Sequence, residues 1–167
     1  MVGKWHRAFA VCLVLSACVP SEQALQPQDT FRTPSAPFSS TTRVDPARFS
    51  GAWRVTAAFA SSEGTLPPVK LQIAASATGL RVEQGGWMMP AGTYASRMPG
   101  RYSRQGGPEI WLLWVDDDWR TAAMASPDGR LGWIMERGPQ AADRQKAARG
   151  ILGWMGFDLG KLRKVAP

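Results

Sequence analysis

Side chains that could perform catalysis are scarce in this sequence. The one histidine is His6, and the two cysteines are Cys12 and Cys18, so all three lie near the start of the chain. Beyond Cys18 there is neither an imidazole nor a thiol, which excludes Ser-His-Asp and Cys-His nucleophiles and the usual zinc ligands. No pair of carboxylates stands out either. We therefore expect no catalytic residue, no cofactor and no enzymatic activity.

Three consecutive aspartates form the one dense group of carboxylates. Asp116, Asp117 and Asp118 lie between two apolar runs, where a hairpin turn is expected. A Ca²⁺ loop places its ligands at alternating positions, and this contiguous run does not. The pattern therefore indicates a turn, and we expect no metal site.

The first 17 residues have the pattern of a secretory signal. Two basic residues precede the apolar run Ala8–Leu15, which is too short to span a bilayer as a helix. The run ends in Leu15-Ser16-Ala17-Cys18, which resembles the bacterial lipoprotein cleavage box. The resemblance implies that residues 1–17 are removed. Cys18 would then carry a diacylglyceryl group on its thiol and a further acyl chain, such as palmitate, on its amine. A plain signal peptide with a chance cysteine is the alternative.

An anchor of more than one acyl chain holds a protein stably on a membrane. Val19 follows Cys18, whereas in enteric-type sorting an Asp there would retain the protein at the inner membrane. We therefore expect an outer-membrane lipoprotein that faces the periplasm. With Cys12 removed and Cys18 acylated, the mature domain would have no disulfide.

Residues 18–43 are predicted to form the lipidated N-terminus and a flexible tether. This stretch is rich in Pro, Ser, Thr and Gln and has little to bury. The chain as a whole is basic, with a formal charge of +7, but its basic residues are scattered. They indicate at most a mild attraction to anionic lipid head groups. No nucleic-acid partner is expected for an exported protein.

Four blocks between Val44 and Pro167 resemble the lipocalin family, and among lipocalins the bacterial outer-membrane type. In chain order they are Gly51-Ala52-Trp53, Asp116 with Trp119, the run Trp133-Ile134-Met135-Glu136-Arg137, and the tail Gly156–Leu162. The first block follows an Asp, a basic residue and an aromatic, as the family motif does. A single Gly-x-Trp occurs often by chance, but four blocks in the family's order do not.

The resemblance implies an all-β fold over residues 44–167: an eight-stranded antiparallel up-and-down lipocalin barrel with one C-terminal α-helix packed on its wall. The patterning agrees, because short apolar runs alternate with turn signals. It predicts strands at 53–60, 69–76, 80–87, 93–98, 101–104, 110–115, 121–126 and 130–136, a helix at 141–155, and a last strand at 161–165 beside the first.

The resemblance also sets which side chains would face the barrel interior. With Trp53 inward and Asp116 and Arg137 at their motif positions, alternation along each strand follows. The predicted ligand-lining residues are Val55, Ala57, Phe59, Ile110, Leu112, Trp114, Ala122, Met124, Trp133 and Met135. The predicted structural residues are Gly51, Trp53, Asp116, Trp119 and Arg137, with Arg137 stacked over Trp53 to close one end.

Two functions remain open. In the first, the protein binds or transports a small hydrophobic ligand, such as a fatty acid or a lysophospholipid, in the cell envelope, since burial of apolar surface alone can hold such a ligand. In the second, the barrel is filled by its own side chains and has a structural or interaction role. The domain is short for a lipocalin, and the shortening falls between Trp87 and Gln105, which favours a narrow barrel. The natural ligand and the oligomeric state do not follow from the sequence.

Overall fold

The computed structural model of the protein describes residues 30–167. The elements of this part, in chain order, are α1 Pro46–Phe49, β1 Gly51–Phe59, β2 Lys70–Ser76, β3 Gly79–Gln84, β4 Gly92–Met98, β5 Arg101–Ser103, β6 Glu109–Val115, β7 Thr121–Ala125, β8 Gly132–Glu136, α2 Ala142–Trp154, the 3₁₀ turn η1 Leu159–Lys161 and β9 Leu162–Lys164. The predicted signal and Cys18 lie outside the described residues. Neither α-helix of the described part is long and apolar enough to cross a membrane.

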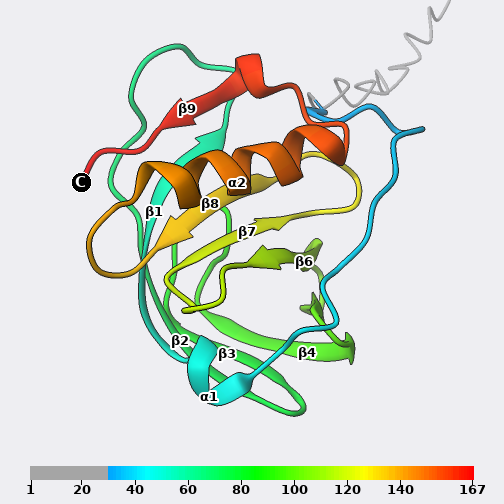
Figure 1. Ribbon diagram of the computed structural model, residues 1–167. Helices are drawn as coiled ribbons and strands as arrows, with labels where there is room; N and C mark the ends of the chain where they lie inside the picture. Colours follow the sequence, from blue (N-terminus) through cyan, green and yellow to red (C-terminus); the bar gives the residue numbers. More distant parts are fainter. Residues whose placement is uncertain (1–29) are drawn as a thin grey trace, which may run out of the picture.

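Strands β1 to β8 close into a barrel. Each strand pairs antiparallel with the next one along the chain, and β8 returns to pair with β1. Strand β1 is shared, because its first half pairs with β2 and its last residues pair with β9. Helix α2 packs across the wall formed by β6, β7 and β8 (Figure 1). The predicted eight-stranded up-and-down barrel with one C-terminal helix is therefore confirmed.

The predicted strands and helix are all present, with small differences at their ends. The largest difference is in the third strand, which was expected to reach Trp87 and ends at Gln84. Two glycines follow, and a β-carbon at Gly86 would lie 2.5 Å from Cγ1 of Val69. This close approach of two loops leaves no room for a side chain, and the strand gives way to a turn there.

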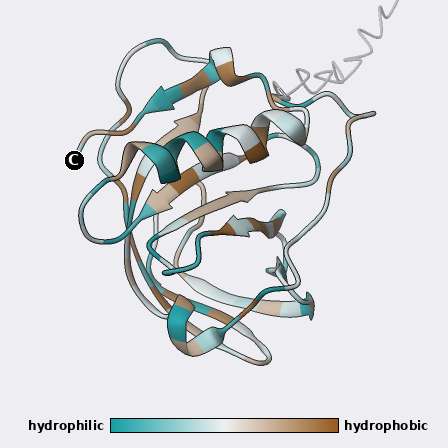
Figure 2. Cartoon of the chain, viewed as in Figure 1, coloured by the Kyte–Doolittle hydropathy of each residue, from teal (hydrophilic) through white to brown (hydrophobic). Residues whose placement is uncertain are grey.

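The apolar side chains form two layers. One cluster fills the barrel interior and draws on all eight strands. The second lies outside the wall, where Leu113, Ala123 and Ile134 pack beneath Ala148 and Leu152 of α2. In Figure 2 the most hydrophobic residues lie along the strands, while α2 carries both hydrophobic and hydrophilic residues. The two layers explain why β6 is apolar on both of its faces, as the sequence indicated.

Two β-bulges change which side chains face inward. The register with β8 shifts between Val55 and Ala57 of β1, and the register with β7 shifts between Leu112 and Trp114 of β6. An extra residue in one strand turns every side chain beyond it to the opposite face of the sheet. Strict alternation therefore fails in the second half of both strands.

Residues 30–43 run along the barrel and pack against it (Figure 1). The ring of Phe31 stacks on Phe59 with centroids 5.8 Å apart, and the ring of Phe38 lies 4.8 Å from Trp111. Two aromatic residues in this polar stretch thus find partners on the outer face of the wall. Aromatic pairs of this kind contribute about 0.5–1.5 kcal/mol beyond their buried area.

Polar contacts hold the same segment in place. Arg32 is buried, and its Nε donates to the carbonyl of Met155 at 2.8 Å. The amide of Thr41 donates to the carbonyl of Leu112 at 2.8 Å. For its described part, the expectation of a flexible tether with little to bury was therefore wrong. The composition of this segment is polar on average, and it therefore did not indicate that a few of its side chains pack against the barrel.

Candidate ligand-binding site of the barrel

A short helix closes one end of the barrel. Asp45 caps α1 by accepting from the amide of Arg48 at 3.1 Å, and Pro46 occupies the first turn. The helix ends at Phe49, which is fully buried against Trp53 with ring centroids 5.4 Å apart. The indole Nε1 of Trp53 donates to the carbonyl of Phe49 at 2.9 Å, so the indole is fixed in orientation.

Arg137, which directly follows β8, connects that strand to α1 and to the start of β1 at this end of the barrel. Its guanidinium carbon lies 3.7 Å from the centroid of the Trp53 ring, and its nitrogens donate to the carbonyls of Phe49 at 2.8 Å, Ser50 at 3.0 Å and Arg48 at 3.2 Å. The predicted stacking of Arg137 over Trp53 is confirmed. Burial lowers the pKa of Arg137, and the nearby carboxylate of Asp116 opposes that shift.

Asp116 shapes the turn between β6 and β7. Its Oδ1 accepts from the amides of Arg120 at 2.7 Å and Thr121 at 2.6 Å. Trp119 in the same turn has a φ of 60°, is buried, and lies beneath the guanidinium of Arg48. The predicted structural role of both residues agrees with this geometry. Within residues 30–167 no group of three His, Cys, Asp or Glu side chains is placed to hold a metal ion.

Seven of the ten predicted ligand-lining side chains belong to the interior cluster. All seven are completely buried; they are Val55, Ile110, Leu112, Ala122, Met124, Trp133 and Met135. They pack with one another and with Trp53. The centre of the barrel is therefore occupied by the protein's own side chains.

The other three predicted lining residues lie outside the barrel, so this part of the prediction was wrong. Ala57 and Phe59 belong to the layer beneath α2, and Trp114 packs against that same layer. The two bulges described above are the cause, because each one reverses the alternation that the prediction extended from Trp53 and Asp116.

The sequence reasoning missed interior residues on β2 to β5. They are Leu71, Ile73, Leu80, Val82, Tyr94 and Tyr102 on the strands, and Met88 and Met89 in the loop after β3. Alternation in 69–76 and 80–84 was a usable signal for the first four. No periodic signal identifies the two methionines, because a turn closed by Gly86 and Met89 carries them inward.

A small pocket remains at the barrel end opposite α1. The loops 85–91 and 104–108 lie together at that end, since successive connections of an up-and-down barrel alternate between its ends. The pocket has a volume of about 260 Å³. Met88, Tyr94 and Ile110 of the interior cluster form its apolar floor, and Arg104 lies at its rim. We call this space the mouth pocket.

The polar groups of the mouth pocket are few and defined. The Tyr94 hydroxyl donates to the carbonyl of Pro90 at 2.8 Å. Burial raises the pKa of Tyr94, and the adjacent Arg104 guanidinium partly opposes that shift. Arg104 itself is exposed. The arrangement suits a ligand with an apolar end and an anionic end.

Comparison with known proteins supports the assignment of the fold. The model of the Lipocalin-like domain family matches residues 96–167. Solved structures cover the earlier strands as well. The siderocalin Ex-FABP is 14% identical, with a TM-score of 0.55 over 72% of this chain and 95% of that one. The protein has the lipocalin fold.

Two further lipocalin-like structures resemble this barrel to a similar extent. Lobster apocrustacyanin A1 is 12% identical, with a TM-score of 0.52 over 72% of this chain and 78% of that one. The cockroach allergen Per a 4 is 14% identical, with a TM-score of 0.52 over 80% and 97% of the two chains. No curated protein sequence matched the chain. At identities of 12–14%, these structures show the fold of the barrel and nothing finer.

Proposed function

We propose that this lipocalin binds an amphipathic lipid, such as a fatty acid or a lysophospholipid, at the mouth pocket. The observation that carries the proposal is the apolar floor of Met88, Tyr94 and Ile110 with Arg104 at the rim. An acyl end would lie on the floor, and burial of its surface would contribute about 25 cal/mol per Å². The carboxylate or phosphate would face Arg104, whose charged donors favour anionic oxygens.

The size of the pocket limits what it holds. Its volume of about 260 Å³ lies just below the usual range for small-molecule sites, so it accommodates the end of an acyl chain. A longer chain requires side chains of the filled interior to move. Met88, Met124 and Met135 are suited to this, because methionine is unbranched and adapts to irregular shapes.

In the proposed setting the barrel acts in the envelope of a bacterium. The lipoprotein-like box before Cys18 supports an acyl anchor, and Val19 supports an outer-membrane destination with the domain facing the periplasm. Lipid exchange or envelope maintenance would then bring the barrel close to its ligand source.

A filled barrel with a structural or interaction role is the second candidate. It is favoured by the complete burial of the seven inward side chains listed above. The two candidates differ in one measurable property, which is saturable binding of a lipid by the folded protein.

The test is a titration of the delipidated full chain with a fluorescent fatty acid. We expect saturable binding, weakened about tenfold in Arg104→Gln, since a charge-assisted hydrogen bond is lost. Arg130→Gln is the matched control, because Arg130 is also an exposed arginine in a loop at the same barrel end. A neutral fatty alcohol probe should bind both variants equally. Absence of saturable binding with intact circular dichroism would refute the proposal and favour the filled barrel.

A further inference from the structure

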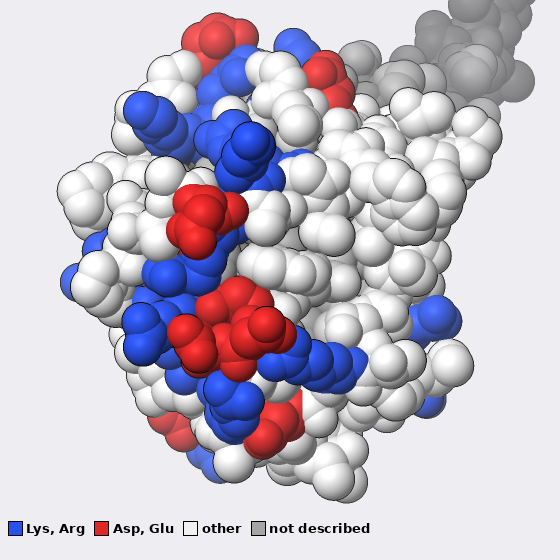
Figure 3. All heavy atoms as spheres, viewed as in Figure 1, with Lys and Arg blue, Asp and Glu red and all other residues white. Residues whose placement is uncertain are grey.

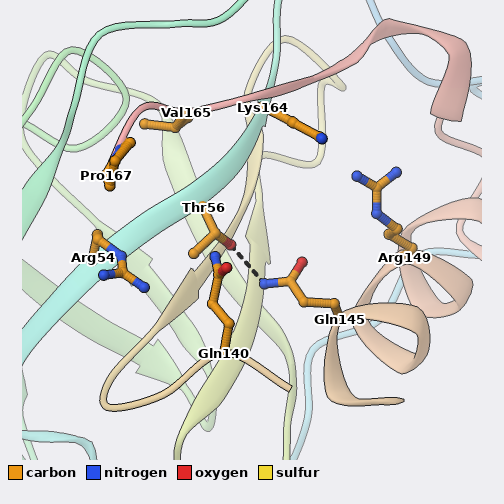
Figure 4. A pocket seen from close by; sticks show the side chains of 8 residues that line it. All are labelled: Arg54, Thr56, Gln140, Gln145, Arg149, Lys164, Val165 and Pro167. Carbon is orange, nitrogen blue, oxygen red and sulfur yellow. Dashed lines mark hydrogen bonds between the residues drawn. The ribbon is translucent and has the colours of Figure 1, made fainter. Parts of the chain in front are cut away.

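A second cavity lies on the outside of the barrel, between β1, α2 and β9. Its volume is about 470 Å³, and it is lined by Arg54, Thr56, Gln140, Gln145, Arg149, Lys164, Val165 and Pro167 (Figure 4). Arg54 lies between the inward-facing Trp53 and Val55 on β1, so it points away from the interior. This outer groove is therefore separate from the mouth pocket.

Three cations from three different elements line the outer groove, with Gln140 and Gln145 between Arg54 on one side and Arg149 and Lys164 on the other (Figure 4). Arg54 comes from β1, Arg149 from α2 and Lys164 from β9. Figure 3 shows basic side chains along one side of the molecule, beside α2 and β9, with acidic side chains among them. The fold thus places three basic residues from separate parts of the sequence along one groove.

None of these three cations forms an ion pair with a carboxylate of the described residues. The four ion pairs within residues 30–167 involve other arginines, and Pro167 takes part in none of them. Glu136 lies opposite Arg54 in the β1–β8 register, yet its Oε1 accepts from Thr121 at 3.0 Å and it forms no ion pair with Arg54. The side chains that line the groove therefore include three cations and no Asp or Glu.

Neutral donors complete the lining. The amide Nε2 of Gln145 donates to Thr56 Oγ1 at 2.8 Å, which holds this side chain against β1 (Figure 4). Thr56 is buried, so this contact is built into the wall. Gln140, from the loop before α2, makes no side-chain hydrogen bond within residues 30–167 and retains its donors.

We propose that the outer groove binds a phosphate ester. Arg149 and Lys164 lie on the same side of the groove (Figure 4), where the guanidinium can present a fork of donors to phosphate oxygens and the lysine adds a point charge. The volume lies within the range of small-molecule sites, so it leaves space for a polar substituent such as glycerol. Such a group occurs in the headgroup of an anionic phospholipid and in soluble phosphorylated metabolites.

The experiment has one arm for each source of this chemistry. In the first arm, the purified full chain is titrated with sn-glycerol 3-phosphate by calorimetry. In the second, the full chain carrying Cys18→Ser, which removes the expected anchor, is sedimented with phosphatidylglycerol vesicles and with neutral phosphatidylcholine vesicles. Each arm is repeated with Arg149→Gln and with Lys146→Gln. Lys146 is the control, because it lies on the same helix but does not line the groove.

We expect saturable binding that Arg149→Gln weakens about tenfold and Lys146→Gln leaves within twofold. Binding in the first arm indicates a soluble ligand, and binding only to phosphatidylglycerol vesicles indicates a lipid headgroup; either result supports the site. No binding in either arm, or equal weakening by both variants, overturns it. Arg149 makes no side-chain hydrogen bond or ion pair within the described residues, so neither variant should disturb folding.

Discussion

At the scale of single residues, the core contains two tyrosines whose hydroxyls are harder to ionise because they are buried. Tyr102 on β5 is only 2% exposed, and burial raises the pKa of its hydroxyl to about 12. Tyr94 on β4 is equally buried, and its pKa is raised as well. Burial disfavours the charged phenolate, so the folded state binds these protons more tightly than the unfolded chain does.

The expected consequence is loss of stability at high pH. The contribution of Tyr102 is fully present below pH 10, where the unfolded chain also keeps the proton, and it is lost as pH rises towards 12. A shift of this size corresponds to about 2–3 kcal/mol in the free energy of unfolding. Urea denaturation at pH 8, 10 and 11.5 measures this loss. Tyr102→Phe should show a distinctly weaker dependence, and identical pH profiles for the two proteins would contradict the argument.

At the scale of elements, one short helix depends on a distant side chain. Helix α1 has only four residues, too few to be stable alone. Its last carbonyls accept from Arg137, which follows β8 in the chain and also covers Trp53. Through these contacts, Arg137 therefore connects the start of β1 to the end of β8.

Removal of this side chain should destabilise the barrel. We expect Arg137→Gln to lower the free energy of unfolding by about 2–4 kcal/mol, because charged hydrogen bonds and a cation–π contact are lost together. Arg137→Lys should lose an intermediate amount, since it keeps the charge but not the fork of donors. Chemical denaturation at neutral pH measures both. Arg130 is an exposed arginine in another loop, so Arg130→Gln is the control. If Arg137→Gln lowers the free energy of unfolding no more than Arg130→Gln does, the contacts of Arg137 with α1 and Trp53 contribute little.

At the scale of the whole molecule, the docked segment 30–43 brings the start of the described chain onto the barrel wall. An anchor at Cys18 would therefore be connected to a chain that meets the barrel wall already at Phe31, and not first at residue 43. In such an arrangement the barrel would remain near the membrane surface.

Membrane attachment of the whole protein should depend on a single thiol. We expect the chain expressed in a Gram-negative host to fractionate with membranes, and Cys18→Ser to appear in the soluble fraction, because acyl chains supply the membrane affinity. Cys12→Ser, which lies in the expected signal, is the control and should remain in the membrane fraction. Continued membrane association of Cys18→Ser would count against lipidation.

The sequence alone was sufficient for the barrel and its closed end. Turn signals and apolar runs located the strands, and the motif around Trp53, Asp116 and Arg137 predicted the stacked pair that the structure contains. Turn signals and apolar runs are local and can be read from the sequence directly, whereas the closed barrel and the stacked pair followed from the resemblance of these motifs to lipocalins. The same alignment predicted the lining of β7, β8 and the first half of β6, but failed at Trp114.

Only the tertiary structure decided which surfaces are free to bind. Bulges reversed the faces of Ala57, Phe59 and Trp114, and the interior closed around its own side chains. The fold also assembled Arg54, Arg149 and Lys164, which are far apart in sequence, into one groove. Register shifts and long-range packing arise from the balance of many contacts across the sheet, and no local pattern records them.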